Sequence, residues 1–347
     1  MMPRRPIRVL VVDDSAVVRT ILREGLTADE RIEVVGTARD AFDARDQIVR
    51  LRPDVMTLDI EMPRMDGVDF LRRLMPQFPL PVVMVSSTSE HGRATTMDAL
   101  QAGAVDFVAK PNRAMSTGVD RMLRELRTKV KIASTANVAH WKVERAWPQT
   151  HRTSRFRQGS IVVIGASTGG TEAIRTVLMQ LPPDFPPVLI VQHMPPRFTK
   201  TFASLLNDDS PLRVRESEDG AVLNPGCALV APGGQQVRVV GRGGSFCVQY
   251  AGTKKVNGHC PSVDVMMWSA AKAVGRDCVG VLLTGMGADG ARGLLAIRQA
   301  GGTTVAQDEA TSVVYGMPRE AYAVGGVDFV RPIERVAEQL LDSVSVN

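Results

Sequence analysis

Three residue types that can perform acyl transfer each follow an apolar run in the second half of the chain. Ser167 follows S-I-V-V-I-G-A, His193 ends P-P-V-L-I-V-Q-H, and Asp289 lies in L-L-T-G-M-G-A-D-G. A serine hydroxyl needs a base before it attacks a carbonyl carbon; histidine is the usual base, and a carboxylate fixes the histidine tautomer. The carboxyl ends of parallel strands share one edge of a sheet, so we expect the three side chains to meet in one crevice.

The glycine-rich turn around Ser167 has other interpretations. S-T-G-G before a helical pattern is also typical of a helix cap or of a loop that binds phosphate. G-A-S-T-G fits the G-x-S-x-G turn of α/β-hydrolases, in which the acid precedes the histidine along the chain. That order would make His259 the base, with an aspartate between Ser167 and His259 as the acid. A regulator that only binds a nucleotide or a protein through these loops is a further alternative.

Polar residues also follow the predicted strands of the first half. Asp13 and Asp14 follow the first strand, Asp59 the third, Ser86 the fourth and Lys110 the fifth. Three carboxylates at one edge repel one another unless a cation is bound, and an all-oxygen ligand set suits Mg²⁺. Asp59 can attack phosphorus as a nucleophile, while Ser86 and Lys110 can bind phosphoryl oxygens. The pattern predicts a phosphorylation site on Asp59.

Periodicity and turn residues indicate which elements position these residues. In the first half, apolar runs alternate with helical patterns, which predicts a doubly wound parallel sheet. The predicted strands are 8–12, 32–36, 55–58, 82–85 and 105–109, and the predicted helices are 17–26 after a Ser15 cap, 41–51, 68–75, 91–102 and 120–132.

The second half predicts another doubly wound α/β domain. Its predicted strands are 161–164, 186–193, 214–216, 277–284, 303–307 and 328–330. Short β elements at 226–231, 236–240 and 246–250 predict a β-hairpin excursion. The predicted helices begin after Gly170 and cover 198–206, 263–274 with a Ser262 cap, 293–300, 316–323 and 333–341.

Charge and composition limit the remaining classes of protein. The net charge is +5, but residues 112–158 hold 11 Lys and Arg against 3 Asp and Glu, which leaves the rest of the chain with 31 basic and 34 acidic residues. We therefore assign the basic excess to a linker and expect no nucleic-acid site. No apolar run approaches a membrane span, and the four cysteines form no C-x-x-C pair. We expect a cytoplasmic protein with reduced, mostly buried thiols and no membrane insertion.

The first half resembles the receiver domain of bacterial two-component response regulators. V-V-D-D-S, T-L-D-I-E-M-P-R-M-D-G, V-S-S and D-F-V-A-K-P carry the resemblance over about residues 7–130. It implies a flavodoxin-like fold, phosphorylation of Asp59 and Mg²⁺ held by Asp13 and Asp14 together with Asp59. It also implies that Ser86 and Phe107 are the switch residues.

Almost the whole chain resembles the chemotaxis protein-glutamate methylesterase family, through G-A-S-T-G-G, V-Q-H-M-P, P-S-V-D-V, L-L-T-G-M-G-A-D-G and Y-G-M-P-R-E. The resemblance implies a Rossmann-like esterase domain without a cofactor. In that domain Ser167 is the nucleophile, His193 the base and Asp289 its orienter, while Thr168 and Met286 support the oxyanion turn. Methyl-accepting chemoreceptors are the implied substrates, with glutamine deamidation as a second activity and a chemotaxis histidine kinase as phosphodonor. We expect a monomer.

The predicted domains are a receiver over residues 1–130, a linker over 131–158 that carries Trp141 and Trp147, and a catalytic domain over 159–347. A receiver joined to an enzyme is most simply a lid. We therefore predict that it covers the Ser167 crevice until Asp59 is phosphorylated. Two positions depart from the family pattern. Gln235-Gln236 stand where a histidine is common and Cys260 where an arginine is common, and we expect both to contact the receptor.

Overall fold

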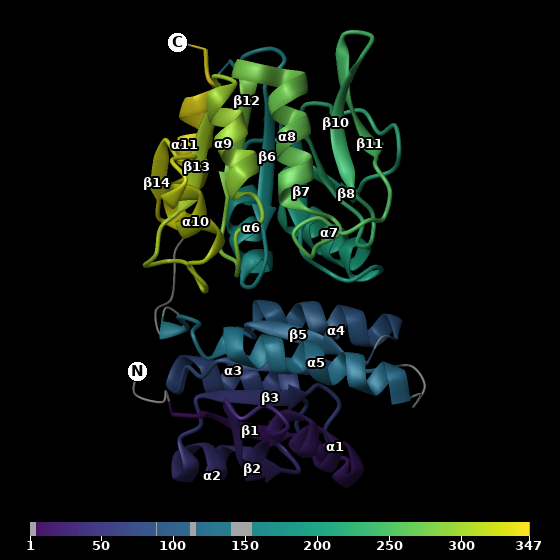
Figure 1. Ribbon diagram of the computed structural model, residues 1–347, viewed down its shortest axis with the longest axis vertical. Helices are drawn as coiled ribbons and strands as arrows, with labels where there is room; N and C mark the ends of the chain where they lie inside the picture. The colour runs from purple at the N-terminus through teal and green to yellow at the C-terminus, as the bar shows by residue number, and fades with distance from the viewer. Residues whose placement is uncertain (1–4, 88, 112–115, 140–154, 347) are drawn as a thin grey trace. The chain divides into compact units, whose positions relative to one another are not determined.

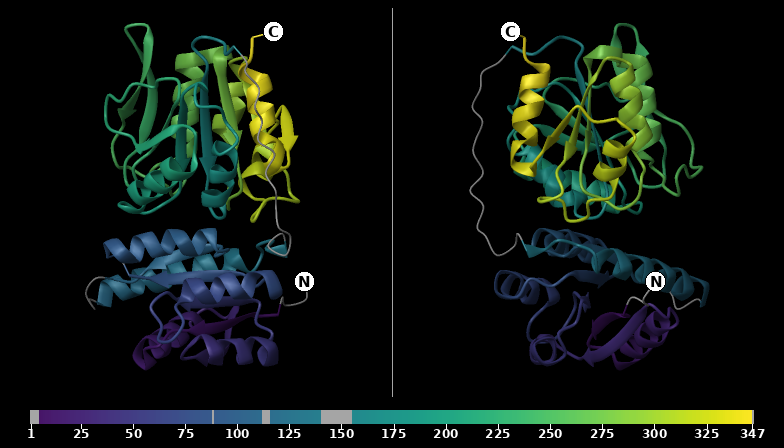
Figure 2. Two further views of the ribbon diagram at one scale, coloured as in Figure 1. Left: turned by 180° about the vertical axis from the view of Figure 1, so that it is seen from behind. Right: turned by 60° about the vertical axis from the view of Figure 1, so that its left-hand side comes forward.

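Two compact units, Met1–Glu144 and Arg145–Asn347, make up the protein in this computed structural model (Figure 1). The structure describes residues 5–87, 89–111, 116–139 and 155–346. Each unit has a central parallel sheet with helices on both faces (Figure 2). The prediction of two doubly wound α/β folds is therefore confirmed. Trp141 and Trp147 of the predicted linker lie outside the described residues.

The first unit holds five parallel strands in the order β2-β1-β3-β4-β5. The strands are β1 (Ile7–Val12), β2 (Ile32–Ala38), β3 (Val55–Asp59), β4 (Val82–Ser86) and β5 (Asp106–Ala109). The helices are α1 (Ala16–Thr27), α2 (Ala41–Leu51), α3 (Gly67–Gln77), α4 (Glu90–Gln101) and α5 (Ser116–Ala133). All residues of β3 and β4 are buried, as the continuous apolar runs predict for strands covered on both faces.

Side-chain caps set where the helices of this unit begin. Ser15 accepts from the backbone N–H of Val18, as predicted, and Asp40 caps α2 through the N–H groups of Phe42 and Asp43. These caps satisfy N–H groups that have no partner inside the helix. Asp13 and Asp14 lie between the end of β1 and the Ser15 cap of α1.

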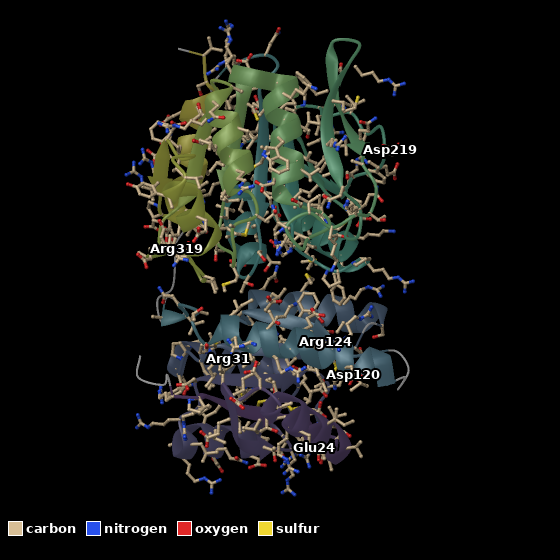
Figure 3. All side chains as sticks on the ribbon, in the orientation of Figure 1. Glu24, Arg31, Asp120, Arg124, Asp219 and Arg319 are labelled. Atoms are coloured by element: carbon tan, nitrogen blue, oxygen red, sulfur yellow. The ribbon has the colours of Figure 1, made fainter. Side chains whose placement is uncertain are left out.

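Helix α5 corrects the predicted location of the basic charge. It begins four residues before the predicted start, and five of the eleven basic residues counted in 112–158 lie on it. Figure 3 labels Arg124, one of these residues. The excess therefore belongs partly to a folded helix, because basic residues can occupy the solvent side of an amphipathic helix without disturbing its apolar side.

The second unit contains a seven-stranded parallel sheet with the order β14-β13-β12-β6-β7-β9-β8. Its strands are β6 (Ile161–Ala166), β7 (Val188–Gln192), β8 (Arg213–Glu216), β9 (Cys227–Val230), β12 (Cys278–Leu282), β13 (Thr303–Gln307) and β14 (Phe329–Arg331). The prediction that 226–231 belongs to the hairpin excursion is wrong. Strand β9 pairs in parallel with β7 and β8, because its apolar run C-A-L-V can be covered on both faces as an inner strand.

The hairpin itself consists of β10 (Val237–Arg242) and β11 (Ser245–Tyr250), which pair antiparallel. The helices are α6 (Gly170–Leu178), α7 (Phe198–Asp209), α8 (Val263–Val274), α9 (Ala291–Gln299), α10 (Met317–Ala323) and α11 (Ile333–Val344), with a 3₁₀ turn η2 (Gly275–Asp277) before β12. Ser262 caps α8 as predicted. Helix α8 packs against α9 and β10, while α6 packs against α7 and α11.

Two general expectations can be compared with the described residues. Among them, no helix is long and apolar enough to cross a membrane. All four cysteines are free thiols, but only Cys247 and Cys278 are buried, whereas Cys227 and Cys260 are partly exposed. The expectation of mostly buried thiols is therefore wrong for half of them, since Cys227 is the first residue of β9 and Cys260 lies in the irregular segment before α8.

Candidate active site

Ser167, His193 and Asp289 follow three neighbouring strands of the second sheet. Strand β6 lies between β7 and β12 in the sheet. Ser167 follows β6, His193 follows β7, and Asp289 lies in the turn after β12. Because all three strands are parallel, their carboxyl ends bring the residues to one edge (Figure 1). The continuous apolar sequence of each strand buries all of its residues, so only the turns beyond them can present polar groups.

The Ser167 turn is held to both neighbouring strands by hydrogen bonds. The backbone N–H of Ser167 donates to the carbonyl of Thr284 at 3.0 Å, and Gln192 Nε2 donates to the carbonyl of Ser167 at 2.9 Å. Thr284 Oγ1 donates to the carbonyl of Thr168 at 3.0 Å. Gly285 is required here, since a Cβ at this position would lie 2.7 Å from the Cβ of Ser167. These contacts fix the serine backbone before any substrate binds.

His193 and Asp289 form a direct pair. His193 Nε2 lies 2.8 Å from Asp289 Oδ2, and the two side chains are 7% and 1% exposed. An ionised carboxylate only accepts, so Nε2 carries the hydrogen and Nδ1 carries the lone pair. Nδ1 is buried and has no hydrogen-bond partner among the described residues. The tautomer therefore leaves Nδ1 as the basic atom of the imidazole.

Asp289 receives five hydrogen bonds at the N-terminus of α8. Besides His193, the donors are Asn257 Nδ2 at 2.8 Å, Ser262 Oγ at 2.7 Å, and the backbone N–H groups of Val263 at 2.8 Å and Asp264 at 3.3 Å. Burial alone would raise the pKa of Asp289. The bond from His193 and those from Asn257 and Ser262 outweigh it and lower the pKa to about 2. The carboxylate stays ionised at neutral pH.

Thr168 directly follows Ser167, and Met286 directly follows Gly285, which packs against Ser167. Thr168 is buried, and Met286 is exposed in the turn between β12 and α9. Gly285 and Gly316 bring this turn close to the segment before α10, where the N–H groups of Gly316 and Met317 donate to the carbonyl of Gly285. The turns that contain Ser167 and Met286 are therefore each held in place by hydrogen bonds to other elements.

The two departures from the family pattern differ in their surroundings. Gln236 is 2% exposed. Its Nε2 donates to the carbonyls of Lys254 and His259 at 3.0 Å each, and its Oε1 accepts from the N–H of Ser262 at 2.8 Å. The Gln236 side chain is therefore not available for a receptor contact, because both of its polar atoms hold the segment 254–262. Gln235 is partly exposed, and its contact with the receptor stays a prediction. Cys260 is partly exposed.

The first unit gathers its predicted residues at the corresponding edge. Carboxylate oxygens of Asp13, Asp14 and Asp59 lie within 4.8 Å of one another. Lys110 Nζ lies 3.0 Å from Asp13 Oδ2 and 2.9 Å from Asp59 Oδ1. Burial raises the pKa of Asp59 to about 6, and Lys110 only partly offsets this effect. A set of carboxylate oxygens fits a hard divalent cation such as Mg²⁺.

The switch residues of the resemblance engage other elements of the unit. Ser86 is fully buried, and its Oγ lies 2.5 Å from Thr96 Oγ1 on α4. Phe107 is also buried, and Lys129 Nζ of α5 lies 5.0 Å from the centroid of its ring. Lys129 is held by Asp106 at 2.9 Å. Both residues thus connect the carboxyl edge of the first sheet to helices α4 and α5.

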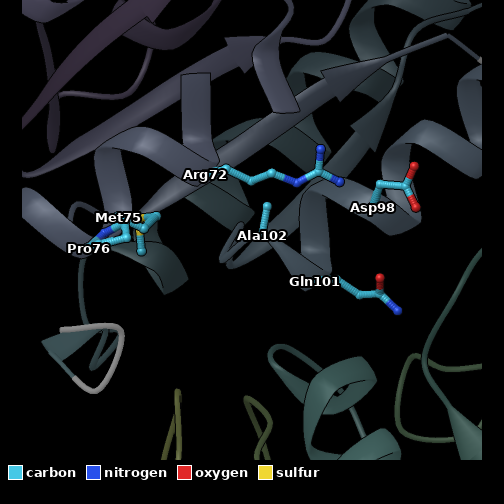
Figure 4. A pocket seen from close by; sticks show the side chains of 6 residues that line it. All are labelled: Arg72, Met75, Pro76, Asp98, Gln101 and Ala102. Carbon is cyan, nitrogen blue, oxygen red and sulfur yellow. The ribbon is translucent and has the colours of Figure 1, made fainter. Parts of the chain in front are cut away.

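A surface pocket of the first unit lies between α3 and α4 (Figure 4). It is lined by Arg72, Met75, Pro76, Asp98, Gln101 and Ala102. None of the predicted site residues lines it, so we assign it no part in the chemistry.

Comparison with known proteins agrees with this arrangement. The response regulator receiver domain family matches residues 9–142, and the CheB methylesterase family matches residues 162–340. The chain belongs to the CheB methylesterase family. It is 54% identical to the protein-glutamate methylesterase/protein-glutamine glutaminase of Syntrophotalea carbinolica, over 99% of both chains. A Pseudomonas aeruginosa protein of the same name, numbered 2, is 49% identical over 98% of this chain and 97% of that one.

A member of the family with a known structure has the same catalytic fold. The CheB methylesterase catalytic domain of Thermotoga maritima is 39% identical, with a TM-score of 0.53, and it covers 54% of this chain and 100% of that chain. Half of this chain therefore has a fold established by crystallography in a relative.

Sequence reasoning missed several residues around Asp289. Asn257 donates to both Asp289 and Asp264, and Ser262 was predicted only as a helix cap. The ring of His259, considered only as an alternative base, stacks on His193. The quoted motif P-S-V-D-V did mark Ser262 and Asp264, but the irregular segment before it has no periodicity from which Asn257 could be placed.

Proposed function

We propose that this protein is a phosphorylation-regulated serine esterase. In this proposal it hydrolyses γ-glutamyl methyl esters on methyl-accepting chemoreceptors and releases methanol during chemotactic adaptation. The observation that carries the proposal is the 2.8 Å pair between His193 Nε2 and Asp289 Oδ2, which leaves Nδ1 as the basic atom of a histidine whose backbone N–H is bonded to the carbonyl of Ala166, next to Ser167. Membership of the family and the names of the relatives support the choice of ester.

The three residues divide the reaction between them. Ser167 Oγ attacks the ester carbonyl carbon while His193 Nδ1 takes the hydroxyl proton, and Asp289 stabilises the resulting imidazolium. His193 then gives the proton to the departing methoxide, and methanol leaves an acyl-enzyme on Ser167. Water attacks this intermediate, again losing a proton to His193, and glutamate and free Ser167 are regenerated.

Thr168 and Met286 take the role of oxyanion support. Backbone N–H groups of their turns would stabilise the negative charge that develops on the carbonyl oxygen. This assignment is supported by the hydrogen bonds that fix both turns before substrate binds. No metal or organic cofactor is needed for these steps, because the nucleophile, base and charge stabilisation all come from the chain.

Deamidation of receptor glutamines is proposed as a second activity of the same site. An amide presents the same carbonyl to Ser167, and ammonia leaves in place of methanol after protonation by His193. The relatives named protein-glutamine glutaminase support this activity. Measuring ammonia released from receptors that carry the glutamines tests it.

The first unit is proposed as the regulatory switch. A chemotaxis histidine kinase would supply the phosphoryl group to Asp59, and Asp13, Asp14 and Asp59 would hold Mg²⁺, which neutralises phosphoryl charge. Lys110 would pair with the phosphoryl oxygens, while Ser86 and Phe107 would transmit the change to the surface helices. A small phosphodonor should raise methanol release by the wild type and leave Asp59→Asn unaffected.

The remaining expectations are part of the same proposal. We propose a monomer in the cytoplasm, without membrane insertion or a nucleic-acid partner. The domain boundaries at residues 130 and 158 stay predictions, beside family matches over 9–142 and 162–340. The predicted covering of the Ser167 crevice by the receiver also stays a prediction. Equal basal activities of the full chain and of a fragment over 159–347 would contradict it.

An active-site serine probe separates this proposal from its two rivals. A fluorophosphonate should label Ser167 in the wild type and in Ser245→Ala, a matched change at the exposed first residue of β11, but not label Ser167→Ala. A binding regulator would not be labelled at Ser167. An α/β-hydrolase that uses His259 as base would keep its labelling in His193→Ala, whereas we expect labelling to be lost.

A further inference from the structure

The ring of His259 lies flat against the ring of His193. Their centroids are 3.7 Å apart, and the planes differ by 3°. The contact covers one face of the imidazole whose edge atoms we assign to Asp289 and Ser167. The ring of His259 makes no hydrogen bond to a carboxylate in the described part of the chain, so it is not built as a second acid–base pair.

The backbone, rather than the ring, sets the position of His259. The N–H and carbonyl of His259 pair with those of Val256 at 2.9 Å, which closes a tight turn. Gln236 Nε2 donates to the same His259 carbonyl at 3.0 Å. Because Gln236 is almost completely buried, this anchor belongs to the core of the unit. His259 is thus presented to His193 from a fixed support.

The same short segment also holds the carboxylate partner of His193. Asn257 Nδ2 and Ser262 Oγ donate to Asp289 Oδ1 at 2.8 Å and 2.7 Å. Residues 257–262 therefore contact His193 on its face and Asp289 on the oxygen that His193 does not use. One segment fixes both members of the pair.

The charge state of His259 suits a stack of this kind. Burial, together with the neighbouring His193, lowers the pKa of His259 to about 4, so its ring is neutral at neutral pH. Two cationic rings at this separation would repel. A neutral aromatic face, by contrast, is attractive to the imidazolium that forms on His193 during the reaction.

We propose that His259 is a positioning residue, whose ring holds the His193 imidazole in the plane that keeps Nε2 on Asp289 and Nδ1 toward the Ser167 turn. The proposal rests on the proposed esterase function, because it assigns His259 to the base of that reaction. It requires a flat ring at position 259 but no proton transfer by that ring.

The test compares His259→Phe, which keeps a flat ring, with His259→Ala, which removes it. Thr253→Ala, an exposed change in the preceding loop, is the matched control. In the full-length protein with methylated receptor, we expect His259→Ala to lower kcat about 100-fold with KM almost unchanged, the size of effect that a misplaced catalytic group produces. His259→Phe should recover at least about tenfold of this loss.

Histidine NMR gives a readout that a merely structural role would not move. In protein with ¹⁵N-labelled histidine, the His193 nitrogens, assigned with His193→Gln, should show one Nε2–H tautomer in the wild type and in His259→Phe. They should show averaging of the two tautomers in His259→Ala. If His259→Ala does not fold, His259→Leu fills the same space without a flat ring and should show the loss instead.

Several results would overturn the proposal. His259→Phe as inactive as His259→Ala would mean that the ring does acid–base chemistry, and full activity of His259→Ala would mean that the stack has no role. Retention of the single tautomer in His259→Ala or His259→Leu would also contradict it. Failure of the wild type to react with the serine probe would instead refute the esterase function, so the two failures are distinguishable.

Discussion

Asp59 and Asp289 are both buried aspartates at the carboxyl edge of a parallel sheet, yet their pKa values shift in opposite directions. The pKa of Asp59 is raised to about 6 and that of Asp289 is lowered to about 2. Their exposures, 4% and 2%, hardly differ. The difference lies in the partners. Asp59 faces Asp13 and has Lys110 and one backbone N–H, whereas Asp289 receives five hydrogen bonds.

The comparison shows that burial raises the pKa of both groups and that the supply of donors decides the difference between them. In the first unit, Asp59 has few hydrogen-bond donors and lies beside other carboxylates. Such a carboxylate is suited to accept a phosphoryl group with a cation nearby. In the second unit, a carboxylate with all its acceptor positions used cannot act as a nucleophile. It can only hold its neighbour His193. The carboxyl edges of two similar parallel sheets therefore support two different chemistries.

The largest expected effect comes from removing the charge of Asp289. Asp289→Asn should lower kcat for methanol release about 10⁴-fold, because an amide can stabilise the wrong tautomer of His193 and cannot stabilise the imidazolium. Asp184→Asn, an exposed change on the same unit, serves as the control. A kcat within about tenfold of the wild type would contradict the role of the pair.

A smaller effect should follow from removing one of the five donors. Asn257→Ala leaves Asp289 and Asp264 without their shared donor, and we expect kcat to fall about 10- to 100-fold, the value of a hydrogen bond to a charged group. Steady-state kinetics measures it, with Asn224→Ala on an exposed loop as the matched change. Unchanged kcat would mean that the remaining four donors suffice.

The smallest effect concerns stability against acid. Because the pKa of Asp289 is lowered from its ordinary 3.8 to about 2, its contribution is present above pH 4 and is lost as the pH falls toward 2. We expect about 2 kcal/mol of unfolding free energy to disappear over this range in the wild type. Hydrogen exchange of β6 and β12 measures it. An equal loss in Asp289→Asn would contradict the assignment.

The fold was largely predictable from the sequence because its strands are continuous apolar runs. Periodicity placed α2, α8 and β13 at their observed bounds. It failed for β9, since a four-residue apolar run fits an inner strand and a hairpin strand equally well. Which sheet such a run joins depends on long-range pairing, which local patterns do not contain.

The site was predictable only where chemistry follows a strand. Ser167, His193 and Asp289 are such residues, and so are Asp59 and Lys110. Asn257 and His259 act from an irregular segment, which Gln236 holds from its position directly before β10. Hydrogen bonds between positions up to 32 residues apart bring this segment to the site. No periodic pattern records those contacts, so their part in the site required the structure.

Methanol release from methylated chemoreceptors, compared between the wild type and Ser167→Ala in the presence of a phosphodonor, tests the central claim most directly. We predict that the wild type releases methanol and that Ser167→Ala loses about 10⁴- to 10⁶-fold in rate, as expected when the nucleophile of a cooperating set is removed. A near-normal rate in Ser167→Ala would contradict the assignment of Ser167, and with it the roles of His193 and Asp289.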